Sequence, residues 1–225
     1  MGKFSKFNDI EAVIIKSEST ILKIEEEYLK CLKEEKIPDS LLVDIKDYLS
    51  NLRSVLDYVW HKIPNVSDGY FPITNSLADF TGKTSKIDAQ YSAVLEKYQD
   101  YNSNSWIRCF SLFRNKNTHF TLVPQKRVES QRVISTHTGG GSVSWDPGSV
   151  RFGSGVFING APVNPSTQMP VSTPDTIVQK EIWVDFVFDG SSISSNFPQG
   201  VSALPFLKKS MQSVLSIVTD LEKVI

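Results

Sequence analysis

The sequence has little of what zinc-binding and disulfide-stabilised proteins need. It contains two cysteines, Cys31 and Cys109, in 225 residues, and neither belongs to a CxxC pair or to a Cys/His cluster. Histidine is nearly as scarce, with three residues. We therefore expect neither a disulfide framework nor a zinc site, and we predict no metal or other cofactor.

Long apolar runs are lacking as well. No stretch approaches the roughly 18 to 20 apolar residues of a membrane-spanning helix, and the opening MGKFSKFNDI lacks the apolar core of a secretory signal. These two observations predict a cytoplasmic protein that does not cross a membrane. The hydrophobic fraction of 40% and the charged fraction of 22% exclude a wholly disordered chain.

Neither sign of charge is in excess, because 24 basic residues stand against 25 acidic ones, a net charge of -1. This near-neutrality argues against a protein that coats nucleic acid through its overall charge. The distribution is uneven, however, since six basic residues and a single acid, Glu129, lie between Arg108 and Arg132. Two interpretations stay open for this segment: local attraction of an anion, or solvated charge at helix ends and strands.

The first half of the chain has the 3.6-residue apolar periodicity of amphipathic helices. On the second of these helices, Arg53 and Asp57 lie four residues apart and are expected to pair. Four amphipathic helices with short connections predict a bundle, because each can bury its apolar stripe only against the others. The helices are expected at about residues 10–32, 39–63, 84–98 and 103–117.

Beyond residue 118 the periodicity changes to two, which is typical of β-strands. Asn159-Gly160 between two short apolar runs predicts a hairpin. The Gly139–Gly141 run predicts a turn and not a phosphate-binding loop, because no Lys-Ser or Lys-Thr pair follows it. In the run EIWVDFVF, alternate residues are expected to face the core: Ile182, Val184, Phe186 and Phe188.

Residues 204–225 return to helical spacing and predict a helix that packs on the bundle or on the sheet. The prediction is therefore an α+β protein with a four-helix bundle, an antiparallel β unit and a C-terminal helix. The expected boundaries are 1–118, 119–203 and 204–225.

The stretch FRNKNTHF at the end of the fourth helix carries the residue types that cleave RNA without a metal. His119 would serve as the base or acid, Arg114 would stabilise the charge on the phosphate, and Asn115 would orient the groups. Positions five apart on a helix point about 140° away from each other. We therefore expect the helix to end between Arg114 and His119, helped by Asn117, a poor residue for helix interiors.

This Arg-Asn-x-x-x-His motif on the last bundle helix resembles the HEPN (higher eukaryotes and prokaryotes nucleotide-binding) helical domains. The chain is also similar, over about residues 43–124, to a group of uncharacterised bacterial proteins with that bundle. The similar segments are NLRSVLDYVW, FPI and THFTLV. The resemblance implies a metal-independent ribonuclease or toxin- or defence-like effector, which pairs two copies of the motif in a homodimer. Arg114, Asn115 and His119 would then be catalytic, and Arg108 and Lys116 of the basic segment would bind the phosphates of RNA.

Three alternatives accompany this interpretation. Arg132 and His137 repeat the spacing of the motif, but the β-branched residues between them predict a strand. The bundle could instead be an inert module for binding or dimerisation, with an unknown partner. A sugar-binding β domain using Trp145 and Trp183 rests on strand alternation alone.

Overall fold

The computed structural model describes residues 7–34, 37–102, 105–119, 121–189, 198 and 200–225. The chain forms two compact units, a helical unit of Met1–Lys126 with Phe186–Ile225 and a β unit of Arg127–Asp185. The predicted α+β class is confirmed, and the division lies inside two strands instead of at helix ends. Among the described residues, no helix combines the length and apolarity that crossing a membrane requires.

The described part of the helical unit contains six α-helices, so the expected bundle of four helices with a fifth at the C-terminus is not confirmed. Sequence reasoning missed the helix after Ser76, whose hydroxyl caps it by accepting a hydrogen bond from the amide of Asp79 at 3.2 Å. The sequence also left open whether the C-terminal helix packs on the bundle or on the sheet. The structure places this helix in the helical unit. The helices are α1 (Asn8–Glu34), α2 (Asp39–Lys62), α3 (Leu77–Thr84), α4 (Ala89–Glu96), α5 (Ser105–His119) and α6 (Ala203–Val224), with a short 3-10 turn at Asp100–Asn102.

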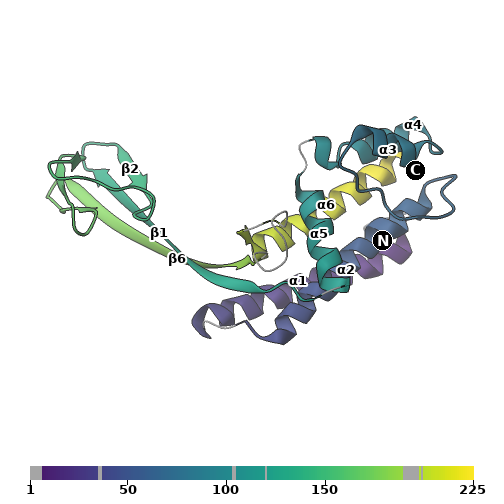
Figure 1. Ribbon diagram of the computed structural model, residues 1–225, viewed down its shortest axis with the longest axis horizontal. Coiled ribbons are helices and arrows are strands. Elements are labelled where there is room, and N and C mark those ends of the chain that lie inside the picture. Colours follow the sequence, from purple (N-terminus) through teal and green to yellow (C-terminus); the bar gives the residue numbers. More distant parts are fainter. Residues whose placement is uncertain (1–6, 35–36, 103–104, 120, 190–197, 199) are drawn as a thin grey trace. The chain divides into compact units, whose positions relative to one another are not determined.

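Helix α2 is the centre of this unit, since it contacts α1, α5 and α6 (Figure 1). Its apolar residues recur every three or four positions, as predicted, and Leu49, Leu52 and Leu56 are fully buried. Burial of one such side chain contributes about 1.5 to 3 kcal/mol. This packing holds α2 against α5.

Helix α5 runs without a break from Ser105 to His119, so the expected end of the helix after Arg114 is wrong. The reason is the side chain of Asn117, which is buried. Its amide nitrogen donates to the carbonyl of Phe113 at 2.8 Å, and its oxygen accepts from the amide of Val123 at 2.8 Å. Asn117 thus stabilises the last turn and fixes the chain that follows.

Replacing Asn117 with alanine is expected to lower the free energy of unfolding by about 1 to 2 kcal/mol, because the buried amide of Val123 loses its acceptor. Urea unfolding measures this effect. Asn115→Ala, at an exposed position of the same helix, is the matched control. Equal losses in the two variants would contradict this role.

The β unit has its own small core, built on Val133, Trp145, Ile158 and Val163. The predicted Asn159-Gly160 hairpin is confirmed, with positive φ angles of 51° and 79° and antiparallel strands on either side. The glycine run forms the turn between the first two strands, as predicted. The strands are β1 (Gln125–His137), β2 (Ser142–Trp145), β3 (Phe157–Ile158), β4 (Ala161–Asn164), β5 (Met169–Pro170), β6 (Thr176–Phe188) and β7 (Val201–Ser202), in sheets of order β2-β1-β6-β7 and β3-β4-β5.

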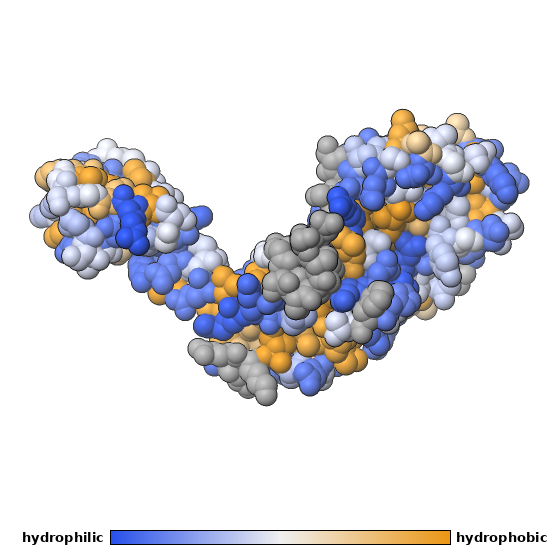
Figure 2. Space-filling model, in the orientation of Figure 1, coloured by the Kyte–Doolittle hydropathy of each residue, from blue (hydrophilic) through white to orange (hydrophobic). Residues whose placement is uncertain are grey.

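Strand β6 faces a core along only part of its length. Phe186 and Phe188 are buried in the helical unit, where the ring of Phe188 lies 4.3 Å from that of Phe113. Ile182 is 53% exposed, so its expected place on the core is wrong. Apolar residues also reach the surface elsewhere in the unit that contains β2 (Figure 2).

The alternatives based on the β unit find little support in its structure. Trp145 is buried in the core, so it cannot offer its ring to a sugar together with Trp183. Arg132 and His137 lie on strand β1, as predicted. The guanidinium of Arg132 lies 5.7 Å from the centre of the Trp183 ring, while the Nδ1 atom of His137 accepts a hydrogen bond from Gly139.

Candidate functional site

A cavity of about 790 Å³ opens in the helical unit. Its walls come from α2, from the loop after α2, from the end of α3 with the residues that follow it, and from α5. Arg114, Asn115 and His119 all line it, so the three predicted catalytic residues meet at one surface although the helix is unbroken.

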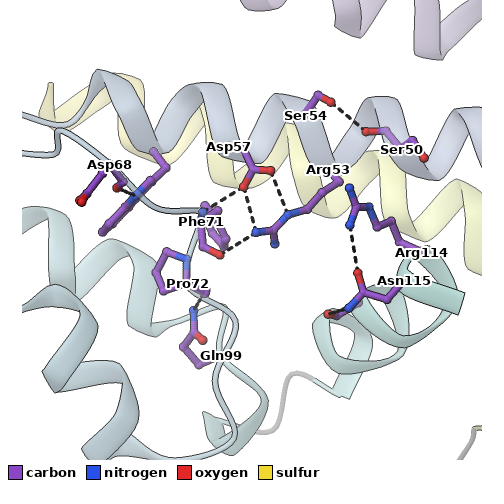
Figure 3. Close-up of polar contacts among 12 residues, drawn as sticks. Ser50, Arg53, Ser54, Asp57, Asp68, Phe71, Pro72, Gln99, Arg114 and Asn115 are labelled. Atoms are coloured by element: carbon purple, nitrogen blue, oxygen red, sulfur yellow. Dashed lines mark hydrogen bonds and ion pairs between the residues drawn. The ribbon is translucent and has the colours of Figure 1, made fainter. Parts of the chain in front are cut away.

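The Arg53–Asp57 pair on α2 lines the cavity and connects this helix to the loop that follows it (Figure 3). The predicted pairing is confirmed: Arg53 Nε and Nη2 lie 3.1 and 2.9 Å from the two carboxylate oxygens of Asp57. Arg53 also donates to the carbonyl of Phe71 at 3.1 Å, and the amide of Phe71 donates to Asp57 at 3.0 Å. An exposed pair would contribute only a few tenths of a kcal/mol, whereas this one also fixes a loop.

Two guanidinium groups face the same cavity. Burial lowers the pKa of Arg53, the neighbouring Asp57 opposes that shift, and the positive charge of Arg114 lowers the pKa further. Arginine nevertheless stays protonated in proteins. The proximity of Arg53 and Arg114 therefore concentrates positive charge at the cavity wall.

Gln99, buried after α4, anchors the next part of the loop. Its side-chain oxygen accepts from the amide and the hydroxyl of Thr74 at 2.9 and 3.1 Å, and its nitrogen donates to the carbonyl of Pro72 at 3.1 Å. Together with the bonds at Phe71, these contacts hold the loop backbone at Phe71, Pro72 and Thr74. Sequence reasoning missed Gln99, because nothing in its local sequence distinguishes it from a solvent-exposed glutamine.

Asn115 and His119 lie one turn apart on α5, on the face that also carries Ser111. Arg114 turns toward this face, since its Nη1 atom donates to the side-chain oxygen of Asn115 at 3.0 Å (Figure 3). The side-chain nitrogen of Asn115 in turn lies 3.5 Å from the hydroxyl of Ser111. His119 is exposed, and no hydrogen bond or ion pair joins it to a described residue.

Arg114 has no acidic partner in the part of the chain that the structure describes. Among the described residues no carboxylate lies within ion-pair distance of its guanidinium, and its buried Nε atom has no hydrogen-bond acceptor. A partly buried guanidinium without a counter-charge or a full set of acceptors is unfavourable unless an anion joins it. This arrangement makes the cavity a candidate anion site.

Lys83 and Lys86 add to the positive charge, and sequence reasoning missed both. They line the cavity and form no ion pair within the described part of the chain. Four cationic side chains and two carboxylates, those of Asp57 and Asp68, line the cavity, which gives a net charge of +2 with His119 neutral. The one available signal was their spacing of three residues in the segment GKTSK.

The two predicted phosphate-binding residues, Arg108 and Lys116, do not line this cavity. Arg108 is exposed, and its Nη1 atom lies 3.8 Å from a carboxylate oxygen of Asp100. Lys116 is half-buried on α5. His61 is exposed in the last turn of α2 and also lies outside the cavity.

The described residues contain no group of three or more His, Cys, Asp or Glu side chains that could hold a metal ion. Comparison with known proteins finds no matching family model, no similar curated protein and no similar solved structure.

Proposed function

We propose that the cavity binds a phosphodiester of RNA and that the protein is a metal-independent ribonuclease of the toxin- or defence-effector kind. One observation carries the proposal: the guanidinium of Arg114, which forms no ion pair with a described residue, shares a positively charged cavity with the accessible imidazole of His119. An oxyanion held by Arg114 would supply the counter-charge that the described residues do not. The similarity of the motif to HEPN domains supports the same reaction.

Each residue has a role in the proposed reaction. His119 takes the proton of the ribose 2′-hydroxyl, and the 2′-oxygen forms a bond to phosphorus as the bond to the 5′-oxygen breaks. Arg114 stabilises the charge that builds on the phosphate oxygens, and Asn115 orients Arg114 through their hydrogen bond. The departing 5′-oxygen receives a proton from an acid, which leaves a 2′,3′-cyclic phosphate and a 5′-hydroxyl.

A homodimer would provide that acid. His119 is the single histidine that lines the cavity of one chain, and a second copy would bring a second His119. We therefore propose that two motifs pair across a dimer, as the HEPN resemblance implies. Light scattering on the purified protein measures the mass, and a monomer that still cleaves RNA would exclude this arrangement.

An inert binding module is the second candidate, and the unbroken helix favours it. Arg114 and His119 leave a continuous helix in directions about 140° apart, and Arg114 is turned toward Asn115. The same cavity would then hold RNA without cleaving it. Incubation of RNA with the protein in EDTA separates the two candidates, since only the first yields shorter products with cyclic phosphate ends.

Binding of the phosphate is tested at Arg114. We expect Arg114→Gln to weaken the affinity for single-stranded RNA by about tenfold or more, since a hydrogen bond to a charged group contributes about 1.5 to 3 kcal/mol. Arg108→Gln is the matched control, because it removes the same charge from the same helix outside the cavity. Equal effects of the two substitutions in a fluorescence anisotropy titration would reject the cavity as the binding site.

A further inference from the structure

Tyr70 is the most exposed large apolar or aromatic side chain described in the structure, and it lines the same cavity. It is 77% exposed. Its hydroxyl forms no hydrogen bond with a described residue, and its ring packs against no other described ring. The fold therefore gains little from an aromatic residue at this position.

The backbone on both sides of Tyr70 is nevertheless held in place. Gly69 before it has a φ of +84°, a conformation that favours glycine. Phe71 after it is buried, and both its amide and its carbonyl bond to the Arg53–Asp57 pair. A side chain on a fixed backbone loses less conformational entropy when a ligand packs against it.

We propose that the Tyr70 ring stacks on a nucleobase next to the phosphate held by Arg114, so that the ligand is single-stranded RNA. This inference rests on the proposed function. The face of a tyrosine ring stacks on any base, and single-strand-binding proteins combine such rings with a positively charged groove. Lys83 and Lys86 supply that charge on the same cavity. A duplex conceals the faces of its bases and cannot use Tyr70 in this way.

The dimensions of the site agree with a ligand of this kind. A volume of about 790 Å³ is within the range of about 300 to 1,000 Å³ of sites for small organic ligands. It is large enough for a base, its ribose and a phosphate, but not for the width of a duplex. The remainder of the strand would lie outside the cavity.

The test measures the affinity of Tyr70 variants for a short single-stranded RNA and for a duplex that contains the same strand. We expect Tyr70→Ala to weaken single-strand binding by about tenfold and Tyr70→Trp to retain it, because stacking needs the ring and not the hydroxyl. Duplex affinity and the weak affinity for inorganic phosphate should stay as in the wild type. Tyr58→Ala is the matched control, since Tyr58 is 49% exposed on α2 and does not line the cavity.

The outcomes separate this inference from the proposed function. If Arg114→Gln weakens binding and Tyr70→Ala does not, the phosphate site stands and stacking is rejected. If Tyr70→Ala weakens single-strand and duplex binding alike, stacking is also rejected. If Arg114→Gln has no effect, the phosphate site fails and this inference fails with it. Circular dichroism establishes that each variant is folded before its affinity is compared.

Discussion

We expect His119→Ala to lower the rate of the proposed RNA cleavage by about 100- to 10,000-fold, which is the usual contribution of a positioned acid or base, and to leave RNA affinity nearly unchanged. We expect the affinity to persist, because His119 is exposed and bonds to no described residue, while in the proposed site Arg114 and the two lysines would still attract the phosphate. Cleavage is followed on labelled RNA in EDTA, under single-turnover conditions, so that the rate reports the chemical step.

His61→Ala is the control for this experiment, because His61 is also exposed, on the neighbouring helix, but lies outside the cavity. We expect it to cleave like the wild type. Cleavage that survives in His119→Ala would identify a contaminating nuclease or another base. A loss of affinity as large as the loss of rate would make His119 a binding residue instead.

Asp57→Ala is expected to lower the free energy of unfolding by about 3 kcal/mol. The substitution leaves Arg53 charged and without its partner at a site where its side chain is 13% exposed, and it removes the acceptor of the Phe71 amide. Because both side chains retain some contact with water, the expected loss is at the lower end of what breaking a buried pair costs. Urea unfolding measures it.

The control for Asp57→Ala is Asp68→Ala, which removes a carboxylate of the same cavity that forms no described ion pair. Its unfolding free energy should be nearly that of the wild type. Hydrogen exchange adds a local measurement, since the Phe71 amide should lose its protection in Asp57→Ala. If both aspartate variants are equally stable, the pair does not anchor the loop.

Predictions from the sequence succeeded where the signal is local. Helix α2 was predicted from its apolar spacing, and the Arg53–Asp57 contact from its four-residue separation. The Asn159-Gly160 hairpin follows from backbone angles that those two residues adopt readily. In each case the atoms that interact are a few residues apart.

Predictions failed where a distant partner decides the outcome. Asn117 was expected to interrupt α5, but its side chain finds the amide of Val123 and completes the helix end. Ile182 was expected to face the core, but it is exposed. Alternation of apolar and polar residues does not show how far along a strand the packing against other elements extends. Gln99 and the burial of the Arg53–Asp57 pair depend on the loop that folds over them.

The sequence by itself determined the described helices other than α3, the change to strands after α5 and the three residue types of the FRNKNTHF motif, since periodicity and residue chemistry are properties of the chain. Only the tertiary structure decided that Arg53, Tyr70, Lys86 and Arg114 line one cavity. These residues are far apart along the chain, and packing of α5 and the anchored loop on α2 sets the distances between them.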